Sequence, residues 1–317
     1  MERRVLPVSV IIPTLNRPNA LFRTIETLLK MDTVPAQLVV VDQTAKAEDR
    51  QKIQRYLKDI RVIPAEYYFL QKPSSTRARN IGIEGAKENI LLFMDDDVDV
   101  NPDTLENIYR YMRDEKNAMV GVIDETLPES TGRLGYLFAM KSWKNRRMGH
   151  VTPAVLGRYP DRVKGVVPTM WAMGFCFALK KDRLDAWQLR FDEKLTGYAY
   201  AEDLDITYAY YKQAKAEGLR CLLAEDLKVK HLESKEYRIP NSLNTYKYVI
   251  NREYLSYKHG MSVWARLCIR WANFGQFLLR LRQGAGAGDI WRAQCRCDMI
   301  RKQLRQGMIS EEFYKQQ

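Results

Sequence analysis

The 317-residue sequence contains no stretch of 18 apolar residues, and its cleanest apolar run, residues 172–179, is far too short to span a bilayer. The N-terminal segment is basic and then apolar, as in a signal peptide. It lacks a small-residue cleavage site, however, and Pro7 and Pro13 bracket a strand-like run instead. The five cysteines are irregularly spaced with no C-x-x-C pair, which argues against a disulfide framework or a structural zinc site. We therefore expect a cytoplasmic protein.

Glycine-rich phosphate-binding motifs are also missing. No G-x-G-x-x-G follows the first expected strand and no G-x-x-x-x-G-K-[ST] occurs, so a dinucleotide-binding domain and a P-loop enzyme are both disfavoured. No helix-turn-helix, RNP or zinc-finger pattern is visible, and we expect no nucleic-acid partner.

The net charge of +12 is unevenly distributed. Residues 240–317 carry 13 Lys and Arg against 5 Asp and Glu, whereas residues 1–239 carry 38 against 34. Nucleic acid, anionic lipid or a phosphorylated substrate would each attract such a basic segment.

Short apolar segments alternate with amphipathic segments along the first two thirds of the chain. This alternation predicts an α/β fold with a mostly parallel sheet and helices on both faces, in which ligands bind at the carboxyl ends of the strands. Ser74 or Ser75 is the expected N-cap of the third helix. We expect strands at 8–12, 38–41, 67–70, 90–94, 118–123 and 228–231, helices at 19–30, 47–58, 76–87, 102–113 and 200–213, loops over 124–170, and a core segment at 170–179.

The strongest local signal is the run LLFMDDDVDV at residues 91–100. An apolar strand delivers Asp95, Asp96 and Asp97 to its end, and their mutual repulsion calls for a cation. Mg²⁺ or Mn²⁺ fits, since hard divalent ions prefer oxygen ligands and can bridge phosphates. The alternative is an acidic cluster ahead of a helix whose first turn holds Pro102, stabilised by the helix dipole.

Six motifs occur in a characteristic order: IIPTLNR (11–17), VVVDQT (39–44), STRARNIGI (75–83), LLFMDDDV (91–98), GFCFALKK (174–181) and GYAYAEDLDITY (197–208). Together they resemble the family 2 glycosyltransferases with the GT-A fold, of the non-processive bacterial surface-glycan type, over roughly residues 8–235. The resemblance implies an inverting, metal-dependent enzyme of the hexosyltransferase class. Such an enzyme moves a sugar from a nucleotide-sugar, with a UDP-sugar as the expected donor, to a hydroxyl of a glycan or lipid-linked acceptor. The Q-x-x-R-W motif of processive polysaccharide synthases is absent.

The resemblance also implies a nucleotide site after the first two strands. Asp42 is expected to accept a hydrogen bond from a base N–H, although VDQTA here replaces the common VDDGS of the family. A strand-end Asp that caps a turn is the structural alternative for this residue. The residues expected near the nucleotide are Pro13, Thr14, Asn16 and Arg17.

Arg77 and Arg79 flank the start of the third helix, and one of them is expected to reach the diphosphate because a guanidinium matches phosphate oxygens. The family pattern, an Arg directly before an Asn, fits Arg79, whereas Arg77 fits a solvated helix face equally well.

Within the acidic run, the resemblance implies that Asp95 lies near the ribose and Asp97 binds the metal, with Asp96 sharing either role. His231 ends the last expected strand, and some GT-A enzymes use a histidine at this point as a further metal ligand. A loop histidine without a ligand role is an equal alternative.

The Glu202-Asp203 pair begins the helix after GYAYA. The family pattern implies that Asp203 lies beside the acceptor as the general base, with Glu202 orienting it or contacting the acceptor. A carboxylate in this position takes the proton of the attacking hydroxyl, a role worth roughly 10²–10⁴ in rate. The alternative is acidic charge placed at a helix N-terminus.

We expect a catalytic domain at residues 1–239, with a nucleotide-sugar part at about 1–123 and an acceptor part at about 124–239, followed by a basic helical segment at 240–317. In that segment an amphipathic stripe suits an anionic membrane surface at the inner face of the cell membrane. Packing against the catalytic domain or a sister subunit in a homo-oligomer is slightly favoured for the stripe. Its members are Trp264, Leu267, Trp271, Phe274, Leu278 and Leu281.

Two other functions remain possible on this sequence. A non-catalytic nucleotide-sugar or glycan-binding protein of the same fold is disfavoured by the retained Asp97 and Asp203. A nucleotidyltransferase also pairs acids with Mg²⁺, but would show a glycine-rich loop with a basic residue near the N-terminus.

Overall fold

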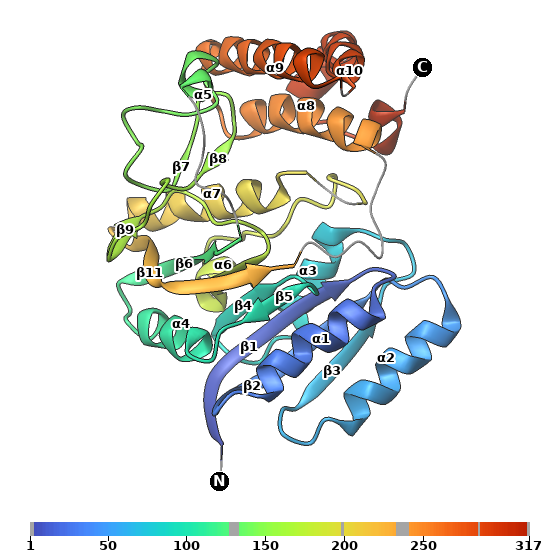
Figure 1. Cartoon of the computed structure of the whole chain (residues 1–317), viewed down its shortest axis with the longest axis vertical. Coiled ribbons are helices and arrows are strands. Elements are labelled where there is room, and N and C mark those ends of the chain that lie inside the picture. Colours follow the sequence, from blue (N-terminus) through green and yellow to red (C-terminus); the bar gives the residue numbers. More distant parts are fainter. Residues whose placement is uncertain (1–2, 127–132, 198–199, 233–240, 285, 316–317) are drawn as a thin grey trace.

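The computed structural model describes residues 3–126, 133–197, 200–232, 241–284 and 286–315. Its central layer is a mixed sheet with the strand order β3-β2-β1-β4-β10-β6-β11-β5, and β9 pairs with β11 (Figure 1). Neighbours among β1, β2, β3 and β4 run parallel, as do β6 and β11, whereas β10 runs antiparallel to both β4 and β6. The sheet strands are β1 (Arg4–Thr14), β2 (Thr33–Asp42), β3 (Ala65–Phe69), β4 (Ile90–Met94), β5 (Val98–Val100), β6 (Asn117–Asp124), β9 (Val166–Pro168), β10 (Cys176–Lys180) and β11 (Arg220–His231).

Helices cover both faces of this sheet, as the alternating pattern predicts. The apolar sides of α1 (Pro18–Leu29), α2 (Ala47–Asp59) and α4 (Thr104–Met112) pack into one core with the residues of β1 and β4 that face them. On the other face, α3 (Ser75–Gly85), α6 (Lys181–Ala186) and α7 (Glu202–Ala216) contribute to a second core. The predicted fold class is therefore confirmed.

Most expected strands and helices appear within a few residues of their predicted bounds. Ser74 is the N-cap of α3, since its hydroxyl accepts a hydrogen bond from the backbone N–H of Arg77. β5 and α6 were not expected, and β2 begins five residues before the expected strand at 38–41. Further details differ. Pro102 precedes α4 instead of lying in its first turn, β11 begins eight residues before the expected strand at 228–231, and the expected loops over 124–170 contain β9 and three short elements. These elements are α5 (Leu134–Leu137), β7 (His150–Val151) and β8 (Gly157–Arg158).

The sheet register brings distant segments to one edge. Because β10 pairs antiparallel with β4, Cys176 lies opposite Met94, and the Asp95 backbone N–H donates to the carbonyl of Phe175 (2.9 Å). The parallel pairing of β6 and β11 places Val229 opposite Asp124, so β11 delivers His231 to the same edge.

The last part of the chain folds as α8 (Asn241–Lys258), α9 (Val263–Gln283), α10 (Ala287–Met299), α11 (Arg301–Arg305) and the 3₁₀ helix η1 (Glu311–Tyr314). In Figure 1, α8 lies between α7 and the pair α9 and α10. Trp171 and Leu204 share a buried cluster with Tyr246 and Ile250 of α8, so these helices pack directly on the α/β part. The division of the chain at residue 239 stays a prediction. Within the described residues, no helix is both long and apolar enough to cross a membrane.

The orientation of α9 corrects one expectation. All six residues of its apolar stripe are exposed, from Trp264 at 67% to Leu278 at 37%. The opposite side, with Ala265, Cys268 and Ala272, is buried. Apart from Trp271, which contacts Leu137 and Phe138, the expectation that the stripe packs against the catalytic domain is therefore wrong. Its contact with a sister subunit or a membrane stays a prediction.

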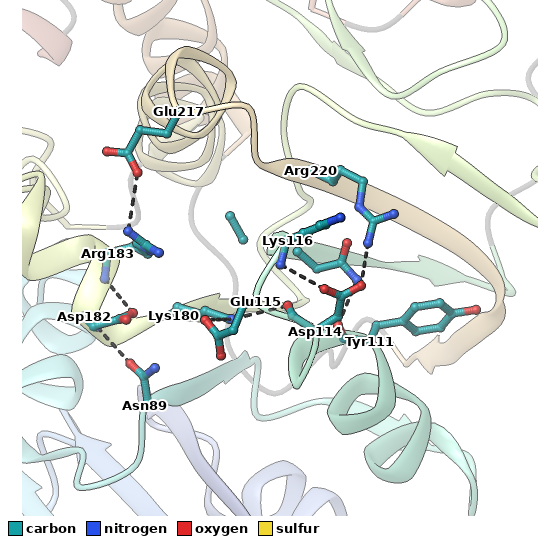
Figure 2. Close-up of polar contacts among 12 residues, drawn as sticks. Asn89, Tyr111, Asp114, Glu115, Lys116, Lys180, Asp182, Arg183, Glu217 and Arg220 are labelled. Carbon is teal, nitrogen blue, oxygen red and sulfur yellow. Dashed lines mark hydrogen bonds and ion pairs between the residues drawn. The ribbon is translucent and has the colours of Figure 1, made fainter.

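At the opposite, amino edge of the sheet, charged side chains are paired with one another (Figure 2). Lys180 ends β10 and donates to Glu115 (3.0 Å) and to the Asp114 carbonyl (3.3 Å). Arg220, which begins β11, pairs with the Asp114 carboxylate at 2.6 Å. This network joins β10, β11 and the end of α4.

Candidate active site

The carboxyl ends of β1 and β4 are joined by a buried polar contact. The Thr14 hydroxyl donates to Asp96 (2.6 Å), and Arg17 pairs with Asp96 at 2.6 Å and with Asp97 at 3.1 Å. Arg17 directly precedes Pro18 at the start of α1. It therefore ties that helix to the acidic run, and its guanidinium is directed at the carboxylates.

Asp96 is fully buried, and this burial dominates its ionisation. Desolvation raises the pKa of its carboxyl to about 7, although Arg17 and the Thr14 hydroxyl both favour the charged form. The Asp96 backbone carbonyl also accepts a hydrogen bond from Thr24 of α1 (2.8 Å). Asp96 thus holds the loop after β4 in place beneath its two neighbours.

Asp95, Asp97 and His231 together form a possible metal site. One ligand atom from each residue lies within 4.8 Å of the others, and Asp97 Oδ1 is 3.2 Å from His231 Nε2. Two carboxylate oxygens and one imidazole nitrogen suit Mn²⁺ or Mg²⁺ better than a thiophilic metal. The residues present therefore fit the divalent ion that the acidic run predicts.

His231 is oriented by the residues around it. Its ring stacks on Phe175 with centroids 5.4 Å apart, and its backbone N–H donates to Asp124 (3.2 Å). Burial lowers the pKa of His231, but the hydrogen bond and charge of Asp97 outweigh it, and the net shift is upward. Metal binding would have to displace that proton, because imidazole binds metal in its neutral form.

Arg79 is buried and bridges the two acidic motifs. Its guanidinium donates to Asp95 (2.9 Å), to Glu202 (2.8 Å) and to the Gly174 carbonyl (3.3 Å). A contact between Arg79 and the donor diphosphate, as expected from the sequence, would have to compete with these three hydrogen bonds. Arg77 of the same helix is exposed.

Glu202 and Asp203 begin α7 directly after Ala201, which adopts a left-handed conformation (φ 67°). Asp203 accepts hydrogen bonds from the Gly174 and Leu204 N–H groups, both at 2.7 Å. Burial raises the pKa of Asp203, and it raises the pKa of Glu202 to about 7 against the opposing charge of Arg79. The strained Ala201 therefore sets the start of α7 so that the weakly acidic carboxyls of Glu202 and Asp203 lie near the end of β4.

Asp42 and Asn16 organise a second part of the site, at the ends of β2 and β1. Asp42 accepts hydrogen bonds from the Thr44 N–H and from the Tyr67 hydroxyl, both at 2.8 Å. Asn16, with φ 56°, accepts from the Ala45 N–H (2.9 Å), and its own N–H donates to Thr44. The side chains of Asp42 and Asn16 thus both hold the turn after β2, and Pro13 lies buried in β1.

The structure brings Thr14, Arg17, Arg79, Asp95, Asp96, Asp97, Glu202, Asp203 and His231 into one connected polar cluster. Asp205, two residues after the pair, faces away and contacts Lys258 (2.6 Å) and His259 (2.9 Å).

Three residues of the site were not singled out from the sequence. Asp124 ends β6 as Asp42 ends β2, and that shared pattern was available as a signal. The Gly174 N–H on Asp203 depends on tertiary structure alone. Lys247 of α8 donates to the Thr196 carbonyl (2.8 Å), and burial lowers its pKa to about 8 against the influence of Glu202.

The chain is similar to known proteins in its sequence and in its fold. The sequence model described as Glycosyl transferase family 2 matches residues 9–174, just over half of the chain. No curated protein sequence matches. The fold is similar to that of the mannosyltransferase PcManGT from Pyrobaculum calidifontis, solved in complex with GDP-Man and Mn²⁺. The TM-score is 0.56 at 13% identity, over 97% of this chain and 84% of that one.

Two further structures have a similar fold. GalNAc-T7, solved with UDP, GalNAc and Mn²⁺, aligns with a TM-score of 0.56 at 15% identity. The alignment covers 85% of this chain and 55% of GalNAc-T7. Residues 1–349 of TarS from S. aureus align with a TM-score of 0.51 at 16% identity, over 98% of this chain and 89% of that one.

Proposed function

The chain belongs to glycosyl transferase family 2 and has the GT-A fold, and we propose that it is a metal-dependent, inverting, non-processive glycosyltransferase. Its donor is a nucleotide-sugar and its acceptor is a hydroxyl of a glycan or a lipid-linked sugar. A place among the hexosyltransferases and a role in polysaccharide biosynthesis are parts of this proposal.

One observation carries the proposal. Arg79 links Asp95, in the possible metal site, to Glu202, which directly precedes the expected base Asp203. The residues proposed to bind the donor and those proposed to activate the acceptor therefore belong to one hydrogen-bonded unit. A divalent ion held by Asp95, Asp97 and His231 would neutralise the negative charge of the nucleotide diphosphate as it leaves.

The protein residues supply the remaining steps. Asp203 is held by two backbone N–H groups, so one carboxylate geometry is fixed before the acceptor arrives. Its raised pKa makes it a stronger base than an exposed aspartate, which suits removal of the acceptor hydroxyl proton. Attack by that hydroxyl in a single displacement inverts the anomeric centre.

The nucleoside is proposed to bind where β1 and β2 end. Asp42 would accept a hydrogen bond from the base, with Pro13, Thr14, Asn16 and Arg17 around the nucleotide. Arg77, which is exposed at the start of α3, takes the role of the mobile diphosphate contact, because the guanidinium of Arg79 is already engaged.

Two similar structures were determined with different nucleotides, GDP-Man and UDP, so the nucleotide that this chain binds has to be identified by experiment. A thermal-shift screen of UDP-, GDP- and dTDP-sugars, each with Mn²⁺, Mg²⁺ or EDTA, tests the proposal, because a ligand that binds the native state raises Tm. We expect one nucleotide class to raise Tm only with a divalent ion. Equal shifts for every nucleotide, or shifts unaffected by EDTA, would contradict it.

A non-catalytic nucleotide-sugar-binding protein is separated from an enzyme by a second measurement. Release of free nucleotide from the selected donor, with and without added acceptor glycans, reports turnover. The buried, oriented Asp203 favours the enzyme, since a binding protein has no need of a base there.

A further inference from the structure

Exposed apolar side chains of two segments that are far apart in the sequence lie near one another. The exposed stripe of α9 meets the α5 region through Trp271, whose indole N–H donates to the Leu137 carbonyl (2.7 Å). The rings of Trp271 and Phe138 lie 5.2 Å apart, and Figure 1 shows α5 beside α9. Leu137 and Trp143 are 61% and 59% exposed. Trp143 stacks on Tyr136 of α5 with ring centroids 4.0 Å apart, and we call the α9 stripe, Leu137 and Trp143 together the docking face.

The packing of α9 explains why this face points outward. Its inner side carries small residues, and a Cβ added to Gly275 would lie 2.3 Å from the Phe138 ring. The small side therefore packs closely against the protein, which leaves the larger Trp, Leu and Phe side chains at the surface. Apolar side chains that gather on a protein surface commonly mark a binding site.

Basic residues outnumber acidic ones around the docking face, where Asp161 pairs with Lys141 and Asp298 pairs with Arg270. Residues 133–160 contain six Lys and Arg and no Asp or Glu, and residues 263–288 contain four and none. Arg146 lies over the Trp143 ring (5.5 Å). Lys144, Arg147 and Arg282 are exposed and form no ion pair with any described residue.

We propose that the docking face binds the surface of an anionic lipid membrane. Trp and Leu side chains would enter the interface between headgroups and acyl chains, while the surrounding cations meet lipid phosphates. A second copy of the chain fits less well, because a two-fold contact would bring the same cationic rims together. The further step, that membrane binding presents a lipid-linked acceptor to Asp203, rests on the proposed function.

Vesicle co-sedimentation of the full chain tests the inference without any nucleotide-sugar. Phosphatidylcholine vesicles, alone or mixed with phosphatidylglycerol, are compared at low and high salt. We expect binding only to the anionic vesicles, and weaker binding at high salt. Reversing two rim charges, with Lys144→Glu and Arg147→Glu together, should reduce the partition coefficient by more than about tenfold.

Control variants distinguish the contribution of this face to vesicle binding from the effects of net charge and of total apolar surface. Arg55→Glu with Lys58→Glu on α2 makes the same change in net charge at exposed positions away from the docking face. This control should bind as the unaltered protein does. Leu137→Ser with Trp264→Ser should reduce binding, whereas Val5→Ser, at an exposed position on β1, should not. Circular dichroism confirms that each variant is folded.

Three results would overturn the proposal: no binding to anionic vesicles at low salt, equal losses in the two charge-reversal variants, or a dimer in solution that Leu137→Ser with Trp264→Ser dissociates. The last would assign the face to a subunit interface. Asp97→Asn should bind vesicles normally, so failure of the docking face and failure of the proposed catalytic function are distinguishable.

Discussion

At the amino edge of the sheet, Asp114 accepts hydrogen bonds from the Lys116 backbone N–H (2.9 Å) and from Arg220, and the pKa of its carboxyl is lowered, chiefly by the backbone contact. At the carboxyl edge, Asp96 also contacts an arginine, yet burial raises its pKa to about 7. The same residue type with a similar partner thus behaves in opposite ways. Solvent access is the physical difference between them.

The two edges also differ in charge balance. The ion pairs of the amino-edge network join Lys180 to Glu115, Arg183 to Glu217 and Arg220 to Asp114 (Figure 2). The carboxyl edge gathers Asp95, Asp96, Asp97, Asp124, Glu202 and Asp203 around Arg17, Arg79 and His231. A balanced and mostly exposed network stabilises structure, whereas a buried excess of carboxylates favours a divalent cation. The difference separates the structural edge from the candidate active site.

The largest expected effect comes from changing the proposed base, Asp203. Asp203→Asn keeps the shape of the side chain but removes its basicity, so kcat should fall by roughly 10²–10⁴ while donor affinity stays within a few-fold. Asp114→Asn makes the same chemical change at the amino edge and should leave both unchanged. Steady-state rates and donor titrations measure the two quantities. Turnover of Asp203→Asn within tenfold of the unaltered enzyme would place the base elsewhere.

A smaller effect is expected in the pH dependence of stability. Because burial raises the pKa of Glu202 from 4.5 to about 7, the folded state keeps a proton between these values that the unfolded state loses. The free energy of unfolding should therefore decrease as pH rises through this window, by up to about 1.4 kcal/mol per pH unit. Glu202→Gln should flatten this slope in urea unfolding at pH 5, 6 and 7 with EDTA.

Asp114→Asn again serves as the control for this slope. The lowered pKa of Asp114 means that its contribution is lost only below the ordinary range of an aspartate, so the slope between pH 5 and 7 should not change. An unaltered slope in Glu202→Gln would show that other groups titrate there.

The smallest effect is expected from breaking the amino-edge network. Arg220 and Asp114 are both about half exposed, so Arg220→Ala should cost less than about 1 kcal/mol of stability. Urea unfolding measures this cost, and activity should not change. A loss of several kcal/mol would mean that the half-exposed Arg220–Asp114 pair stabilises the fold as strongly as a buried pair.

Local sequence was sufficient for much of the fold and for part of the site. The apolar run 90–94 followed by three Asp predicted β4 and its acidic end, and Ser74 was predicted as a candidate cap of α3. These features depend on neighbouring residues. Arg79, in contrast, meets Glu202 across 123 positions and the Gly174 carbonyl across 95, and no local pattern encodes such contacts.

The α9 helix shows a second limit of pattern reading. The period of Trp264, Leu267 and Trp271 correctly identified an apolar stripe, but periodicity does not say which side of a helix is buried. The small residues Ala265, Ala272 and Gly275 on the other side carry that information, because they allow the helix to approach its neighbours closely.

Mn²⁺ binding, followed by the electron paramagnetic resonance signal of free Mn²⁺, tests the central claim most directly. The titration is made on the unaltered protein, Asp97→Asn and the control Asp114→Asn, each alone and with UDP or GDP. The account predicts that the unaltered protein and Asp114→Asn bind Mn²⁺ equally well, while Asp97→Asn binds it at least about tenfold more weakly. Undiminished Mn²⁺ affinity in Asp97→Asn, or no binding by the unaltered protein, would contradict the assignment of this edge as a metal-dependent donor site.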